Sequence, residues 1–154
     1  VIDGGNAYAQ QRRTQNGVDA AAEAGATQLA RGIVGVPITD ADVATAVDLT
    51  ATANGITSVD SAAYTDRVGT VLGVVGGGTV PVGAQGVKVD GSRDFDTYIA
   101  GVVGMPQWTA SAEATAVTGY AEESGYGGVK AGAIETMSST SVKPGVCCGR
   151  KFTG

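Results

Sequence analysis

The sequence of 154 residues contains no histidine. Histidine is the commonest general base and transition-metal ligand in proteins, so its absence rules out a Ser-His-Asp hydrolase triad. The glycine-rich stretch 73–78 is not followed by the Gly-Lys-Ser/Thr of a phosphate-binding loop. We therefore predict that the protein is not an enzyme and uses no cofactor. The catalytic alternative that stays open is a carboxylate pair for glycoside cleavage, Glu122 and Glu123.

Charged and aromatic residues are also scarce. Charged residues make up 16% of the chain, the net charge is -5, and there are two Phe and one Trp. Without a basic stripe to neutralise phosphates, nucleic acid is not an expected partner. No run of 18 apolar residues is present. The hydrophobic residues are mostly small, and 25 glycines accompany them. Because small side chains bury little area each, stability must come from close backbone approach or from surface buried against neighbours.

Residues 1–36 predict one long helix. Its apolar stripe follows spacings of three and four, through Val18, Ala22, Gly25, Leu29, Ile33 and Val36. At 1.5 Å per residue such a helix spans roughly 45 Å, so part of it is expected to project from the fold. The glycines within it weaken a helix, and we infer that they permit close packing. The residues expected to carry packing and assembly are Val18, Gly25, Leu29 and Ile33.

Residues 37–119 predict an α+β body on which this helix packs. Thr39 and Asp42 match a capping box that opens a second helix, which runs to about Ala53 and stops at Asn54-Gly55. Strands are expected at 62–66, 70–75, 84–90 and 108–119, because from Ile56 onward Thr, Val, Tyr and Gly dominate and the segments are short. In the last of them four alanines alternate with polar residues, which predicts one apolar and one polar face: Ala110, Ala112, Ala114 and Ala116.

Turns and a third helix complete this expectation. Gly76-Gly77-Gly78 and Asp90-Gly91 are typical turn sequences. Residues 95–104 are predicted to form a short helix from the spacing of Phe95, Ile99, Val102 and Val103. The chain is thus expected to be a single α+β domain: a long N-terminal helix and a second helix packed on an antiparallel sheet, with an extended Gly/Ser-rich arm at 120–154.

Two local features suggest further chemistry. Asp90, Ser92, Asp94 and Asp96 alternate in a predicted loop, as at the start of a calcium loop, although the usual glycine and terminal glutamate are missing. A solvated acidic turn is the favoured alternative. Cys147 and Cys148 are adjacent and are the only cysteines. They could form intermolecular disulfides, a strained vicinal disulfide, or remain free thiols.

The N-terminal segment resembles the TadE/TadG-like proteins of the bacterial tight-adherence (Flp) pilus system. The similarity lies in Val1-Ile2-Asp3-Gly4-Gly5 and in Gln15-Asn16-Gly17-Val18-Asp19-Ala20-Ala21-Ala22-Glu23-Ala24-Gly25-Ala26. It covers about 30 residues, and Glu23 departs from the family's apolar pattern. The resemblance implies a pilin-like fold, export, an N-terminal membrane anchor, an extracytoplasmic domain and no catalytic residues. No such anchor precedes Val1 here, so we expect membrane attachment only through a segment absent from this chain.

Together these features predict a secreted, non-enzymatic structural subunit of a bacterial surface filament or pilus. Its expected partner is itself, as a homopolymer, with other pilus components as further candidates. Its expected location is the bacterial cell surface or the extracellular space. The alternatives are a monomeric adhesin or binding module and a membrane-anchored accessory protein of pilus assembly.

Overall fold

A computed structural model describes residues 2–119, 146–147 and 150–151 of the chain. The chain divides into two units, Val1–Gly119 and Tyr120–Gly154. In the second unit the described residues form two short antiparallel strands, β5 (Val146–Cys147) and β6 (Arg150–Lys151). The rest of the predicted arm lies outside the described residues, and everything below concerns the first unit.

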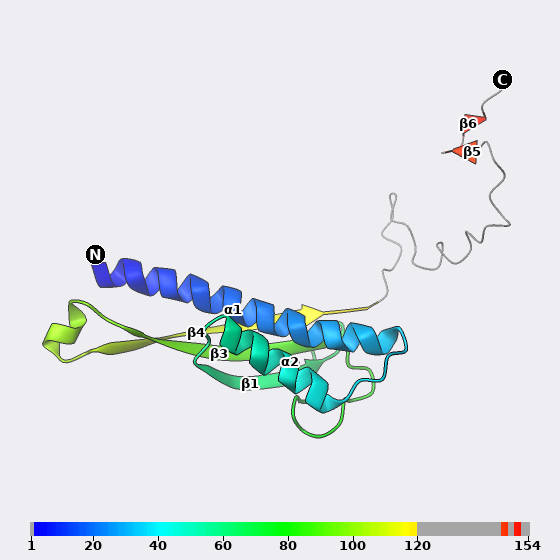
Figure 1. Cartoon of the computed structure of the whole chain (residues 1–154), viewed down its shortest axis with the longest axis horizontal. Coiled ribbons are helices and arrows are strands. Elements are labelled where there is room, and N and C mark those ends of the chain that lie inside the picture. The colour runs from blue at the N-terminus through cyan, green and yellow to red at the C-terminus, as the bar shows by residue number, and fades with distance from the viewer. Residues whose placement is uncertain (1, 120–145, 148–149, 152–154) are drawn as a thin grey trace. The chain divides into compact units, whose positions relative to one another are not determined.

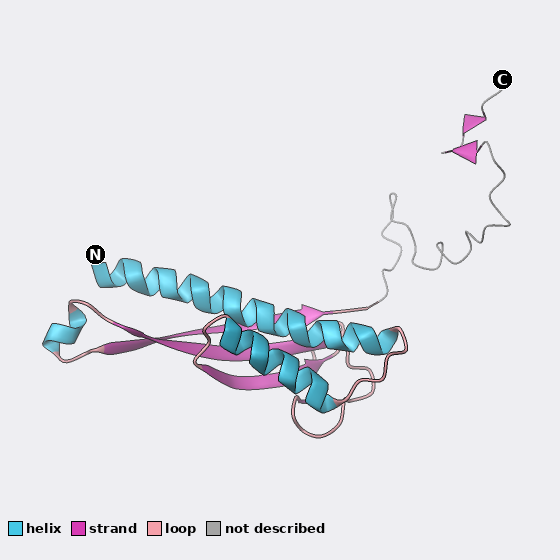
Figure 2. Ribbon diagram, in the orientation of Figure 1, coloured by secondary structure: helices cyan, strands magenta, loops and turns pink. Residues whose placement is uncertain are grey.

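The first unit is a two-layer α+β fold (Figures 1 and 2), as the sequence predicted. Its helices are α1 (Ile2–Ile33) and α2 (Asp40–Ala53), and both lie on one face of the sheet. The four-stranded sheet has the order β2-β1-β3-β4 with every pair antiparallel. The remaining elements are β1 (Ser58–Thr65), β2 (Val71–Val74), β3 (Gly86–Asp96), the 3-10 turn η1 (Ala100–Val103) and β4 (Gln107–Val117).

The core fills the space between the helices and the sheet and is made of small and medium side chains. Val18 and Leu29 of α1 are buried there with valines of α2 and β3. Gly25 lies at the centre, because a Cβ on it would stand 2.9 Å from Val47 Cγ2 and 3.0 Å from Val87 Cγ1. The glycine lets the backbone of α1 approach both partners, which is the close packing inferred from the sequence.

The second helix begins and ends as its sequence predicted. The Thr39 N–H donates to Asp42 Oδ2 at 2.8 Å, and the Asp42 N–H donates to Thr39 Oγ1 at 3.2 Å, which completes the capping box. At the other end Gly55 takes a φ of +73°, which favours glycine. Arg93 of β3 donates to the carbonyl of Gly55 at 2.6 Å and to that of Asn54 at 3.1 Å. This cation satisfies carbonyls just beyond the helix end.

The predicted turn at Asp90-Gly91 is wrong. β3 runs without interruption through Gly86–Asp96 and pairs with β1 and β4 on either side. Gly91 is required for packing instead, because a Cβ there would lie 3.1 Å from Val18 Cγ2 and from Ile56 Cγ2. The alternation of acidic and neutral residues that suggested a calcium loop is therefore the two-residue period of a strand.

Other boundaries also differ from the prediction. α1 ends at Ile33 rather than at residue 36, because Gly35 turns the chain at a φ of +86°. The helix expected at 95–104 is reduced to η1, since Phe95 belongs to β3 and pairs with Trp108 of β4. The two rings meet edge to face, with centroids 6.4 Å apart. The first half of α1 does not project alone, because the long β3–β4 hairpin runs beside it (Figure 1).

Candidate assembly surfaces

The turn that joins β3 to β4, residues 97–106, exposes several large apolar side chains. We call it the tip. Its large apolar side chains are exposed by 56–86%: Tyr98, Ile99, Val102, Val103 and Met105. Side chains of this kind scattered singly over a surface are ordinary, but five within one turn form a patch that indicates an interaction site.

The carboxylate of Asp3, in the first turn of α1, binds the backbone of the tip. Asp3 Oδ1 accepts from the Tyr98 N–H at 2.9 Å, while Oδ2 accepts from the N–H groups of Ile99 at 2.9 Å and Ala100 at 2.7 Å. The hydrogen bond from Ala100 is the main cause that lowers the pKa of Asp3, and burial opposes it. The sequence placed Asp3 in a helix but gave no sign of this contact across 95 residues.

A cleft of about 310 Å³ lies between the first half of α1 and the hairpin. Phe95 and Trp108 form its aromatic wall, and the helix contributes Ala7 and Gln11. In this stretch the helix is joined to the hairpin by hydrogen bonds, among them one of 3.2 Å from Asn6 Nδ2 to the carbonyl of Asp96. The cleft is an open site with a mixed polar and apolar lining, in which the two aromatic rings offer a surface for a small ligand or a side chain.

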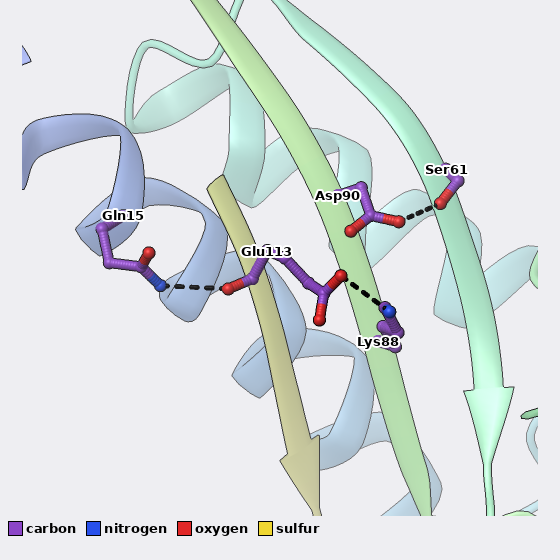
Figure 3. A network of polar contacts seen from close by, with 5 residues as sticks. All are labelled: Gln15, Ser61, Lys88, Asp90 and Glu113. Atoms are coloured by element: carbon purple, nitrogen blue, oxygen red, sulfur yellow. Dashed lines mark hydrogen bonds and ion pairs between the residues drawn. The ribbon is translucent and has the colours of Figure 1, made fainter. Parts of the chain in front are cut away.

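The outer edge of β4 is covered by amide side chains from α1. Gln11 Nε2 donates to the carbonyl of Ser111 at 2.7 Å, and Gln15 Nε2 donates to that of Glu113 at 3.2 Å (Figure 3). An edge strand offers unpaired backbone groups that can join another sheet. Because these two carbonyls are occupied, β4 is a poor edge for pairing with a second chain.

The sheet face away from the helices is polar. Glu113 Oε2 lies 2.8 Å from Lys88 Nζ, and this contact raises the pKa of Lys88 (Figure 3). Asp90 stands directly opposite Glu113 and accepts a hydrogen bond from Ser61. Asp94 accepts from the Thr109 hydroxyl at 2.6 Å.

The aspartates of β3 are the residues for which the sequence suggested calcium binding. Asp90, Asp94 and Asp96 lie along β3, where alternate residues stand about 6.6 Å apart. Among the described residues no three acidic, cysteine or histidine side chains are grouped closely enough to hold a metal ion. The face is therefore best described as a solvated strand surface.

The opposite edge of the sheet carries a second apolar surface. β2 is only four residues long, and Val71, Leu72 and Val74 are exposed. A groove of about 340 Å³ opens beside it between α2 and β1, with Val47 and Val59 among its lining residues. This edge, unlike that of β4, offers apolar side chains next to a short strand.

The residues predicted to carry packing lie in or beside the intramolecular core. Val18 and Leu29 are buried, Gly25 contacts α2 and β3, and Ile33 is half-buried at the end of α1. They pack the helix on its own chain, while their part in assembly stays a prediction. Cys147 lies in β5; Cys148, Glu122 and Glu123 lie outside the described residues.

Comparisons with known proteins give no match: no family model, no curated protein and no solved structure is similar to this chain. The similarity to TadE/TadG-like proteins accordingly stays a hypothesis based on the first 30 or so residues. In the part of the chain that the structure describes, no helix is long and apolar enough to cross a membrane.

Proposed function

We propose that this chain is a non-enzymatic structural subunit that assembles with copies of itself into a filament on the bacterial surface. The observation that carries the proposal is the distribution of its apolar side chains. In the described part of the first unit, about twice as many large apolar side chains are exposed as are fully buried. Much of the fully buried core consists of alanine and valine. A domain whose core consists of small side chains gains stability by burying further surface against neighbours.

The exposed apolar residues are also arranged in a way that suits a chain of subunits. They gather at the tip and at the β2 edge, which are formed by different elements. Two different surfaces that fit one another generate a head-to-tail contact, and such a contact extends into a filament when it does not close. The pilin-like arrangement and the N-terminal resemblance support the same proposal.

Electron microscopy of the purified chain tests the proposal. We expect negatively stained samples at high protein concentration to show filaments, and dilute samples to show short oligomers. Single particles at every concentration would contradict the proposal. Electrophoresis without reductant adds a test of Cys147 and Cys148, because an intermolecular disulfide produces bands that reductant removes.

A monomeric binding module is the second candidate, and the cleft beside Phe95 and Trp108 is the observation that favours it. Aromatic walls and a few polar groups are typical of ligand sites. The two candidates differ in particle size, because a binding module remains a single particle at the concentrations that produce filaments.

A further inference from the structure

We propose that the tip enters the headgroup region of a zwitterionic lipid bilayer, with the first half of α1 standing above it. This inference does not rest on filament formation, and it is compatible with it, because an open head-to-tail filament leaves the tip of its terminal subunit free. It starts from the aliphatic side chains of the tip, of which Val102 is 86% and Val103 is 77% exposed. They lie in the turn at the end of the β3–β4 hairpin (Figure 1), where their apolar surface faces solvent.

Most backbone N–H groups of the tip already have hydrogen-bond acceptors within the protein. An unpaired N–H is costly in lipid, so a segment that enters it must satisfy these groups internally. Three N–H groups of the tip bind the carboxylate of Asp3. Four more N–H groups donate to carbonyls within the turn: the N–H groups of Thr97, Val102, Gly104 and Met105. These seven N–H groups therefore lose no hydrogen bond when the turn is desolvated, and the exposed apolar side chains gain from leaving water.

Farther from the tip, along α1 and the hairpin, aromatic side chains follow the aliphatic ones. Tyr8 is 65% exposed and lies five residues after Asp3, or about 8 Å along the helix axis. Trp108 stands on β4 just after the tip and is partly exposed. Tyrosine and tryptophan prefer the interface of a bilayer, where the ring contacts acyl chains and the polar group contacts headgroups.

Charged side chains lie farther along α1 and on the hairpin near the tip. Arg12 and Arg13 are exposed and lie about 14 Å beyond Asp3 along the axis. Side chains on a helix lean toward its N-terminus, so both guanidinium groups extend toward the level of the lipid phosphates. Asp94 and Asp96 are exposed on the hairpin near the tip. A zwitterionic headgroup offers partners to both signs, whereas an anionic surface repels a chain of net charge -5.

The test uses the full chain and vesicles of phosphatidylcholine. We expect the protein to co-sediment with the vesicles. Trp108 is the only tryptophan, so its emission reports this site alone. We expect that emission to shift to shorter wavelength and to be quenched by lipids brominated on the acyl chain.

The decisive variant is V102D/V103D, which should weaken partition roughly tenfold or more. Its matched control is V68D/V82D, because Val68 and Val82 are exposed by 86% and 102% outside the tip. Circular dichroism confirms that both variants fold. The inference is overturned if wild-type protein does not partition, if V102D/V103D binds like the control, or if bromine does not quench Trp108. The inference is also overturned if the protein does not bind vesicles but associates with itself through the tip. That result would assign the tip to a protein partner.

Discussion

The phenolic oxygen of Tyr64 lies 2.7 Å from Asp40 Oδ1, and this hydrogen bond joins β1 to the first turn of α2. Both residues are buried, Tyr64 completely and Asp40 with 5% exposed. The same carboxylate accepts from the N–H groups of Gly76 at 2.9 Å and Gly78 at 2.7 Å. One carboxylate therefore holds together the sheet, the second helix and the loop that follows β2.

Asp40→Ala should be among the most destabilising substitutions in the first unit. It leaves a buried hydroxyl and two loop N–H groups without an acceptor, which we expect to cost about 3 kcal/mol of unfolding free energy. Urea denaturation measures the loss. Asp48→Ala is the matched control, because Asp48 is an exposed aspartate of the same helix and should change stability little. Equal stability of the two variants would show that the Asp40 contacts contribute nothing.

The same carboxylate should make stability depend on pH in the acid range. The hydrogen bond from Tyr64 is the main cause that lowers the pKa of Asp40 from its usual 3.8, and burial opposes it. A pKa lowered by folding adds stability above the unfolded value, and this stability is lost as the pH falls through the folded value. Three further carboxylates have lowered pKa values, each mainly through one hydrogen bond: Asp3 from the Ala100 N–H, Asp42 from the Thr39 hydroxyl and Asp66 from the Thr70 N–H.

We therefore expect the unfolding free energy to be constant from neutral pH to about pH 5 and to decline below about pH 4. Denaturation curves at a series of pH values measure this decline. The difference between the wild type and Asp40→Asn should shrink on acidification, because protonation removes the same charge from Asp40. A difference that stays constant down to pH 2 would contradict the assignment.

Gly25→Ala tests the close packing of α1. Alanine favours a helix over glycine by up to about 1 kcal/mol. At this position, however, the new methyl group would press on Val47 and Val87 at 3.0 Å or less. We expect a net destabilisation of about 1–2 kcal/mol.

Gly5→Ala is the control for this substitution, since a Cβ at Gly5 meets nothing within 4 Å. It should leave stability unchanged or raise it slightly. Thermal or urea unfolding of the two variants measures the contrast. If Gly25→Ala is as stable as Gly5→Ala, the glycine is not needed for packing.

The Q11A/Q15A variant tests the protection of the β4 edge. Both amides donate to carbonyls of β4, so their removal leaves two edge groups open to another strand. We expect faster aggregation with a rise in thioflavin T fluorescence. Gln28→Ala is the control, because Gln28 lies on the same helix and contacts Arg31 instead. Identical aggregation rates for the two variants would show that the glutamines do not guard the edge.

Local sequence patterns predicted much of the fold. The capping box of Thr39 and Asp42 and the alanine alternation of β4 are confirmed, because each depends on residues close in sequence. Gly91 was misread as a turn residue, since a glycine required by a distant helix looks the same in sequence as one required by a turn. The strand period of Asp90, Ser92, Asp94 and Asp96 was the signal that could have corrected this.

The candidate surfaces were less predictable. The helical spacing of Phe95 and Ile99 concealed a hairpin, because the pairing of Phe95 with Trp108 joins residues 13 positions apart. The attachment of Asp3 to the tip and of Asp40 to Tyr64 depends on still longer separations. A sequence pattern identifies which residues are apolar, whereas their exposure depends on which partners the fold brings to them.

Sedimentation velocity of the whole chain over a wide range of concentrations tests the central claim most directly. We expect the weight-average sedimentation coefficient to rise with concentration, as subunits bury their exposed apolar surfaces against one another. A coefficient that stays at the monomer value up to the solubility limit would contradict assembly.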